Sequence, residues 1–447
     1  MSEAAITRTL ARFLATSRWE DVPEIVRHEG RRSLLNYVAA ALSGHADPLI
    51  ARLLRVLSPL SGSRAATVVG QRVRLDVLSA AFLNTATVNV QDFDDTHMPT
   101  VIHPTAAVAS PLLAWSEHAP VGGRDLLHAL ILGIDAECRI GNALHPSHYR
   151  RGWHTTATCG VFGAAAGIGR LMGLDEDHMV WALGNAATQA CGLIENLGSS
   201  SKSVGVGNAA RNGLAAALFA AEGVDGPAQP IEGARGFIAV ATDTPHPDAV
   251  VRDLGAVWEI RNNTYKPSPC GVVLFPVIDA CLALRASHRL TADQIAHVTV
   301  TGHPLLLERT DRPDVTIAHQ ARVSLQHTAA VAFLYGAAGI VQYGQDCVDA
   351  PEVGALRAKV SAAVDPQCPV ESAAVSVRTT DGRTLDERVA AWRGSLARPL
   401  SDADLEAKLR DVVAAVAPWC DAGRVIETVW TIDRLPDAAA LMRLVVP

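Results

Sequence analysis

The first 225 or so residues are dominated by apolar runs rich in Ala and Gly, which repeat at helical spacing and are separated by Gly or Pro. The clearest runs cover residues 31–44, 103–119, 123–144, 156–174, 175–197 and 206–224. Their small side chains let helix backbones approach closely, and apolar residues on several faces indicate central helices. The chain is 49% hydrophobic but only 5% aromatic, which favours packed helices over an aromatic-rich sandwich. This part of the sequence predicts one helical domain.

The pattern changes after residue 250. Residues 255–260 and 296–302 are typical of strands, and residues 373–389 alternate around Asp381-Gly382, a strong hairpin signal. Helical runs lie between these strands, and Ser401 with Asp404 forms a capping-box pattern before a last helical region. We therefore expect a mainly α fold. A large all-helical domain is built from both chain ends (1–255 and 396–447), with a smaller α/β domain inserted between them (256–395).

Charge, cysteines and hydropathy exclude several classes of protein. The formal net charge is −7 and there is no block of Lys and Arg, so a nucleic-acid partner is not expected. The eight cysteines show no CxxC pairing, which favours buried free thiols in a reducing compartment. The N-terminus does not resemble a secretion signal, and the longest uncharged Ala/Gly stretch is too short to span a bilayer. We expect a cytoplasmic protein without a membrane partner.

Residues 91–105, "QDFDDTHMPTVIHPT", concentrate three acids, two histidines and three threonines. Asp92, Asp94 and Asp95 with His97 or His103 offer the oxygen and nitrogen ligands of a Mg or Mn site. No EF-hand spacing or HExxH motif supports that interpretation. An acid/base site is the second interpretation, and a solvated or capping loop before a helix is the third. The stretch alone does not decide between them.

Three further polar clusters have a structural and a functional interpretation each. His154 precedes a very apolar helix, where it is either a packing or capping residue or a residue of the functional site. Lys202 lies in the Ser- and Gly-rich residues 197–213, which form either a flexible connection or an anion site at a helix start. Lys266 lies in a Pro-rich loop at the domain junction, where ligand clefts tend to form. No P-loop, GxSxG elbow or cofactor-binding lysine signature is present, so we expect a cofactor-independent reaction.

Together, these clusters resemble the MmgE/PrpD family in type and order. The matching segments, which extend nearly from end to end of the chain, are "DFDDTHMPTVIHPT", "GWHTTATCGVFGAAAGIGRLMGLD", Lys202 with "AARNG", "YKPSPCG" and "GSLARPLSDADLEAKL". The resemblance implies that the inserted α/β domain is a lid, and that the protein is a homodimer without organic cofactor. It also implies chemistry next to a carboxylate of a small di- or tricarboxylate: dehydration, decarboxylation or epimerisation.

The resemblance places six residues on the family's active-site positions: Asp92, Thr96, His103, His154, Lys202 and Lys266. Removing a proton alpha to a carboxylate builds up a second negative charge, so the site needs a base and fixed cations. The expected roles are as follows: Lys202, Lys266 and His154 clamp substrate carboxylates, His103 moves the proton, Asp92 or Asp95 orients it, and Thr96 bonds a substrate oxygen. No metal is expected.

Three departures from the family pattern limit the substrate assignment. His327 stands where some relatives carry tyrosine, Phe275 stands where histidine is expected, and Gly205 replaces a histidine after the lysine. His327 can restore a proton donor lost elsewhere and is expected to contact substrate. The leading hypothesis is a dehydratase of a hydroxy-polycarboxylate such as 2-methylcitrate. Epimerase or racemase, decarboxylase and non-catalytic carboxylate-binding protein are the alternatives.

Overall fold

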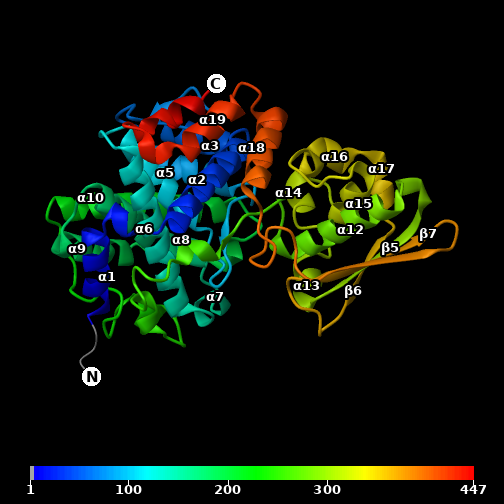
Figure 1. Cartoon of the computed structure of the whole chain (residues 1–447), viewed down its shortest axis with the longest axis horizontal. Helices are drawn as coiled ribbons and strands as arrows, with labels where there is room; N and C mark the ends of the chain where they lie inside the picture. The colour runs from blue at the N-terminus through cyan, green and yellow to red at the C-terminus, as the bar shows by residue number, and fades with distance from the viewer. Residues whose placement is uncertain (1–4) are drawn as a thin grey trace. The chain divides into compact units, whose positions relative to one another are not determined.

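The computed structural model describes residues 5–447 and divides into two compact units (Figure 1). The large unit combines the chain up to Asn263 with Leu405–Pro447, and the small unit is Thr264–Asp404. Helices dominate, so the prediction of a mainly α protein is confirmed. A lid role for the small unit stays a prediction. None of the described helices is long and apolar enough to cross a membrane.

The large unit is built almost entirely of helices. They are α1 (Ile6–Thr16), α2 (Glu24–Gly44), α3 (Pro48–Leu57), α4 (Val77–Asn89), α5 (Pro104–Ser116), α6 (Gly123–Leu144), α7 (Ser147–Arg150), α8 (Thr155–Leu171), α9 (Glu176–Ala187), α10 (Ser201–Ala221), α11 (Phe237–Ala241), most of α18 (Asp402–Val416), and α19 (Ala422–Trp430). Short strands are β1 (Ala66–Thr67), β2 (Arg74–Leu75) and β3 (Thr96–His97), and β4 (Asn263–Thr264) includes the last residue of the large unit's N-terminal segment and the first of the small unit. The C-terminal segment rejoins the N-terminal part of the chain where α19 packs against α2 (Figure 1).

Helix α8 is central and packs against α5, α6, α9 and α10. Glycines permit this close approach. A Cβ on Gly213 of α10 would lie 2.5 Å from the carbonyl oxygen of Val161, and one on Gly133 of α6 would lie 2.7 Å from that of Gly163. Both distances are shorter than side chains tolerate, so the small residues of the apolar runs set how deeply the central helices bury each other.

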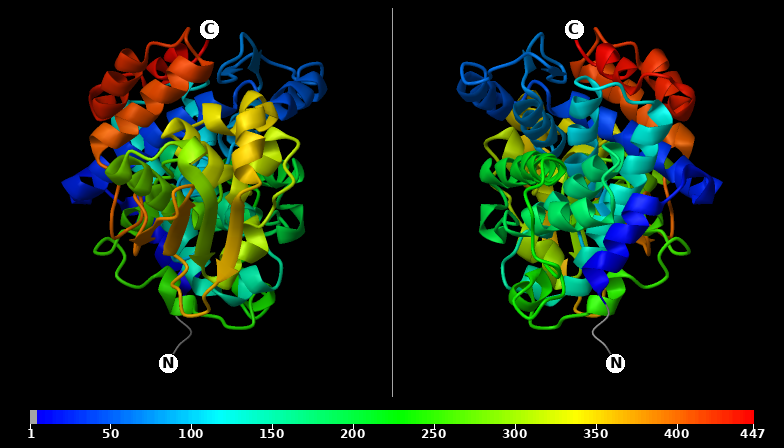
Figure 2. Two further views of the ribbon diagram at one scale, coloured as in Figure 1. Left: turned by 90° about the vertical axis from the view of Figure 1, so that its right-hand side faces the viewer. Right: turned by 90° about the vertical axis from the view of Figure 1, so that its left-hand side faces the viewer.

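The small unit contains α12 (Phe275–His288), α13 (Pro304–Thr310), α14 (Ala318–Ala321), α15 (Leu325–Tyr335), α16 (Gln345–Asp349) and α17 (Pro351–Arg357). Its sheet has the order β6-β5-β7-β8, made of β5 (Ile295–Gly302), β6 (Val360–Val364), β7 (Ala373–Thr379) and β8 (Thr384–Val389). Strands β5 and β6 are parallel, and the other pairs are antiparallel. Helices α12 and α15 contact the sheet, and the left view of Figure 2 faces its strands.

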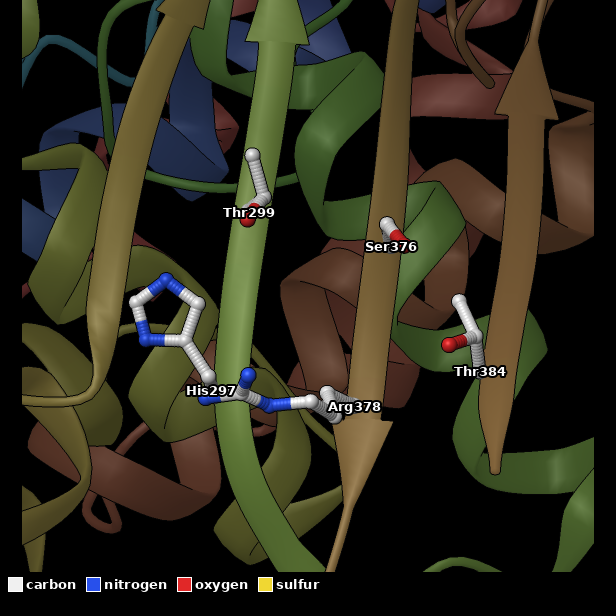
Figure 3. A pocket seen from close by; sticks show the side chains of 5 residues that line it. All are labelled: His297, Thr299, Ser376, Arg378 and Thr384. Atoms are coloured by element: carbon white, nitrogen blue, oxygen red, sulfur yellow. The ribbon is translucent and has the colours of Figure 1, made fainter. Parts of the chain in front are cut away.

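Alternation along the strands gives the sheet two different faces. Val298, Val300 and Val377 are fully buried. The intervening side chains line a hollow of about 350 Å³ on the other face: His297, Thr299, Ser376, Arg378 and Thr384 (Figure 3). This hollow has cationic and hydroxyl groups but no carboxylate among its lining residues, and none of the predicted site residues lies in it.

Local predictions outside the site have mixed outcomes. Gly382 has φ of +90° between β7 and β8, and Ser401 and Asp404 exchange side-chain to main-chain hydrogen bonds, so the hairpin and the capping box are confirmed. The predicted strand at 255–260 is wrong. There Asp135 accepts the main-chain N–H of Glu259, and residues 259–262 form a 3-10 helix. All eight cysteines are free thiols, and six are buried as expected, but Cys191 is exposed.

Candidate active site

Residues 91–105 connect α4 to α5 and are mostly buried despite their polarity. Asp94, Asp95 and Thr96 are each at most 1% exposed. Burial of so many polar groups is expensive unless they are bonded to one another, which argues against a solvated loop. Asp92 has φ of +53°, an uncommon conformation for a residue with a side chain, and such conformations cluster at functional sites.

Lys202 lies in the first turn of α10 and forms an ion pair with Asp92. Its Nζ donates a 2.8 Å hydrogen bond to Asp92 Oδ1, and the lysine side chain is only 15% exposed. Burial acts to lower the pKa of Lys202, but the charges of Asp92 and Asp94 and the hydrogen bond to Asp92 raise it overall. Lys202 is therefore a fixed cation at neutral pH. The Ser- and Gly-rich segment around it is helix from Ser201 onward, not a flexible connection.

His103 precedes α5 and is oriented through its Nδ1 atom. That nitrogen lies 2.6 Å from the carbonyl oxygen of Asp95, 3.2 Å from Thr96 Oγ1 and 3.8 Å from Asp94 Oδ1. A carbonyl oxygen only accepts hydrogen bonds, so Nδ1 carries the hydrogen and a neutral ring has its lone pair on Nε2. Nε2 is therefore the ring nitrogen that can take or give a proton.

The carboxylate of Asp95 is held by Thr105 and Asn263. It accepts hydrogen bonds from Thr105 Oγ1 at 2.5 Å and from Asn263 Nδ2 at 2.9 Å. Burial raises the pKa of Asp95 to about 7, and the charge of Asp94 adds to this effect while the Thr105 hydrogen bonds oppose it. The predicted orienting role for Asp95 thus falls to its main chain, and the carboxylate holds the start of α5.

His154 precedes α8 and interacts electrostatically with Asp92, His103 and Lys202. Burial and, after it, the positive charges of Lys202 and His103 lower the pKa of His154 to about 3, with the charge of Asp92 opposing them. The ring is neutral at pH 7 without substrate, so it offers a hydrogen bond and not the positive charge expected of a clamp. These interactions place His154 near Asp92, His103 and Lys202, and we call these four residues the cluster.

Lys266, His327 and Phe275 belong to the small unit. Lys266 is 1% exposed. His327 is fully buried on α15, where its Nε2 lies 2.9 Å from the carbonyl oxygen of Gln342, and burial lowers its pKa. Phe275 packs against Trp392 with ring centroids 4.7 Å apart. Participation of Lys266 and His327 in the cluster stays a prediction.

Two further residues, Asp94 and Tyr149, act on members of the cluster and were not assigned catalytic roles from sequence. Asp94 Oδ1 lies 3.8 Å from His103 Nδ1, and Asp94 Oδ2 accepts a 2.8 Å hydrogen bond from Asn89. Tyr149 on the four-residue helix α7 acts electrostatically on Lys202. Asp94 lies in the acid-rich stretch but is one of three similar acids, and nothing in the sequence pattern distinguished Tyr149.

The cluster also bears on the metal hypothesis. Asp92, Asp94 and His103 each offer one ligand atom, and these atoms lie within 4.8 Å of one another. The ammonium group of Lys202 already compensates Asp92, which makes the arrangement suited to holding a substrate carboxylate. A fixed cation near an oriented imidazole can bind an organic acid and transfer a proton at an adjacent carbon.

Two family models match the chain: the MmgE/PrpD N-terminal domain at residues 8–249 and the MmgE/PrpD C-terminal domain at residues 268–434. Similar curated proteins include the cis-aconitate decarboxylase of Homo sapiens, 26% identical over 456 residues that cover 98% of this chain and 94% of the relative. The cis-aconitate decarboxylase of Aspergillus terreus is 27% identical over 479 residues, covering 99% and 96%. A cis-aconitate decarboxylase-like protein of Aspergillus oryzae is 26% identical over 471 residues, covering 99% and 98%.

Proposed function

Because the chain belongs to the MmgE/PrpD family, we propose that it is a cofactor-independent lyase that decarboxylates a small unsaturated tricarboxylate of the cis-aconitate type. The observation that carries the proposal is the presence of a fixed cation, Lys202, together with His103, whose ring is oriented through Nδ1 by the main-chain carbonyl oxygen of Asp95. The similar proteins named as cis-aconitate decarboxylases match almost their full length and support this choice of substrate class.

Substrate binding is assigned first to Lys202. An ammonium group has three donors, so Lys202 can keep its bond to Asp92 and donate to a substrate carboxylate at the same time. Neutral His154 and the hydroxyl of Thr96 add uncharged hydrogen bonds. Lys266 is proposed as the second carboxylate ligand. Since the whole chain carries a net charge of −7, binding of a polyanion depends on these local cations.

In the proposed reaction, the bond between carbon and one carboxylate breaks and CO₂ leaves. The electron pair delocalises through the adjacent double bond onto a second carboxylate, where Lys202 stabilises the added charge. His103 Nε2–H then gives a proton to carbon, so one proton is consumed per turnover and is restored from solvent. Asp94 Oδ1, 3.8 Å from His103 Nδ1, favours the protonated ring before this step.

Dehydration, the leading hypothesis from sequence, is the second candidate. The neutral form of His103 carries its lone pair on Nε2 and can remove a proton alpha to a carboxylate while hydroxide leaves from the neighbouring carbon. It ranks second because the similar proteins are named for decarboxylation.

The test is proton NMR in deuterated water with cis-aconitate, citrate and 2-methylcitrate, combined with CO₂ trapping. Decarboxylation predicts CO₂ equal to the substrate lost and one deuterium on the product carbon. Alkene signals without CO₂ would indicate dehydration, and deuterium exchange alone would indicate epimerisation. Binding of these acids by folded protein without any chemistry would overturn the enzyme assignment. His103→Ala should lower turnover by about 100-fold or more, whereas His246→Ala, at an exposed histidine, should not.

A further inference from the structure

The turn between Thr96 and His103 is closed by His97, a residue that the proposed mechanism does not use. His97 N donates to the carbonyl oxygen of Ile102 at 2.7 Å, and its Nδ1 lies 2.7 Å from Thr100 Oγ1. Val101 within the turn has φ of +55°, which is costly for a β-branched residue. A strained turn persists only when its surroundings hold it.

Glu259 holds this turn from a segment 162 residues away. Its Oε2 lies 3.1 Å from His97 Nε2 and accepts a 3.0 Å hydrogen bond from Asn262 Nδ2, with His97 fully buried and Glu259 only 8% exposed. Burial acts to raise the pKa of Glu259, but the hydrogen bonds from His97 and Asn262 lower it to about 2. Because the ionised carboxylate only accepts, His97 Nε2 carries a hydrogen and donates it to Glu259.

Glu259 is itself fixed to α6. Its main-chain N–H donates to Asp135 Oδ1 at 2.8 Å, and Arg139 Nε donates to Asp135 Oδ2 at 2.6 Å. Arg139 also donates to the carbonyl oxygens of Arg252 and Val257. An unbroken series of buried hydrogen bonds therefore connects a central helix to the turn that carries Thr96 and His103.

We propose that Glu259 and His97 are positioning residues that hold Thr96 and His103 in register for proton transfer. Both act through the main chain of the turn. Thr96 adjoins His97, and the main-chain bond from His97 to Ile102 fixes the residue before His103. Lys202 and His154 lie on other segments, so of the proposed substrate ligands only the uncharged hydroxyl of Thr96 depends on the pair. This inference rests on the proposed function.

The test compares Glu259→Ala and Glu259→Gln with the wild-type protein. Glu259→Ala should lower kcat about 10- to 100-fold with little change in KM, because small misplacements of a reacting group have effects of this size. Glu259→Gln keeps a side-chain oxygen that can accept from His97 and should recover most of the loss. If Glu259→Ala does not fold, Glu259→Gln with its smaller expected loss remains the measured variant.

Glu117→Ala is the matched control. The Glu117 side chain is 4% exposed and accepts hydrogen bonds from Thr67 N, Thr67 Oγ1 and Arg74, but it does not touch the turn. It should lower stability without the selective loss of kcat. A rise in KM at constant kcat, or equal kcat losses in the Glu117 and Glu259 variants, would overturn the proposal.

A second measurement separates this proposal from the proposed function. If wild-type protein turns over no tricarboxylate, the proposed function fails, and the imidazole ¹⁵N–¹H signal of His103, identified by its absence in His103→Ala, still reports ring position. We expect this signal to shift in Glu259→Ala and not in Glu117→Ala. An unchanged signal would overturn the positioning role independently of activity.

Discussion

The main-chain carbonyl oxygen of Asp95 lies 2.6 Å from Nδ1 of His103, while the carboxylate of Asp95 is bonded to Thr105 and Asn263. The residue therefore orients the ring by its backbone and stabilises α5 by its side chain. These two tasks are separable by mutation.

Asp95→Asn should reduce stability more than catalysis. The substitution keeps the carbonyl oxygen that orients His103 but places an amide N–H₂ group where Asn263 already donates, at a cost of about 1–3 kcal/mol. We expect a lower midpoint in thermal unfolding and a fall in kcat of less than about tenfold, well short of the loss expected for His103→Ala. A kcat loss as large as that of His103→Ala would show that the carboxylate takes part in the reaction.

Lys202→Met should cost about 100-fold in kcat/KM, since a charge-assisted hydrogen bond to a carboxylate contributes about 1.5–3 kcal/mol and the lost charge also serves the intermediate. Lys202→Arg should retain part of the activity because the charge remains on a differently shaped group. Steady-state kinetics check both variants. Lys359→Met, at a lysine bonded to a carbonyl oxygen in the small unit, is the control. Activity of Lys202→Met within twofold of wild type would remove Lys202 from the mechanism.

Glu137 on α6 should make stability depend on pH. It is fully buried, neither carboxyl oxygen has a hydrogen-bond partner among residues 5–447, and burial followed by the charge of Asp95 raises its pKa well above the usual value. Above the unfolded-state pKa of about 4.3 the unfolded chain ionises while the folded one keeps its proton. Folded stability therefore falls by about 1.4 kcal/mol per pH unit until the folded-state pKa is reached.

The Glu137→Gln variant has no titratable carboxyl group at this position. The free energy of unfolding is measured with urea for both proteins. The value for the variant minus the value for the wild type should increase as the pH rises from about 5 to about 7. Asp95 is present in both proteins, so the difference reports on Glu137 together with its interaction with Asp95. A difference that stays constant over this range would contradict a protonated buried Glu137.

Gly205→Ala should stabilise α10, since a Cβ at this position meets only the Cβ of Ala157, at 3.8 Å. Replacing glycine inside a helix is worth about 0.5–1 kcal/mol. Gly213→Ala on the same helix should instead destabilise, because its Cβ would lie 2.5 Å from the carbonyl oxygen of Val161. Thermal unfolding of the two variants checks the contrast, and equal shifts would contradict the packing described for α8 and α10.

Chelation should leave activity unchanged. Asp92 is compensated by Lys202, and the proposed reaction uses organic acid and base groups only. Activity is measured before and after treatment with EDTA, together with elemental analysis. Stoichiometric metal and an activity lost to the chelator and restored by one cation would instead assign Asp92, Asp94 and His103 as its ligands.

Local signals in the sequence were sufficient for much of the fold. Small-residue runs predicted the central helices, and the Asp381-Gly382 hairpin and the Ser401–Asp404 capping box formed as expected, because short-range sterics and hydrogen bonds decide such elements. Prediction from local patterns failed where a residue distant in sequence forms a hydrogen bond with the main chain. Residues 255–260 are not a strand, since Asp135 on α6 takes the N–H of Glu259.

Residue types and their order also determined the family and the main members of the candidate site, but only the tertiary structure decided their partners. Three aspartates within four positions are equivalent in sequence, yet one meets Lys202, one lies near the His103 ring and one turns its carboxylate to α5. His97 meets Glu259 across 162 residues, and His154 is neutral because it is buried beside Lys202. Burial and charge proximity depend on how helices pack, and no local pattern of residues encodes that packing.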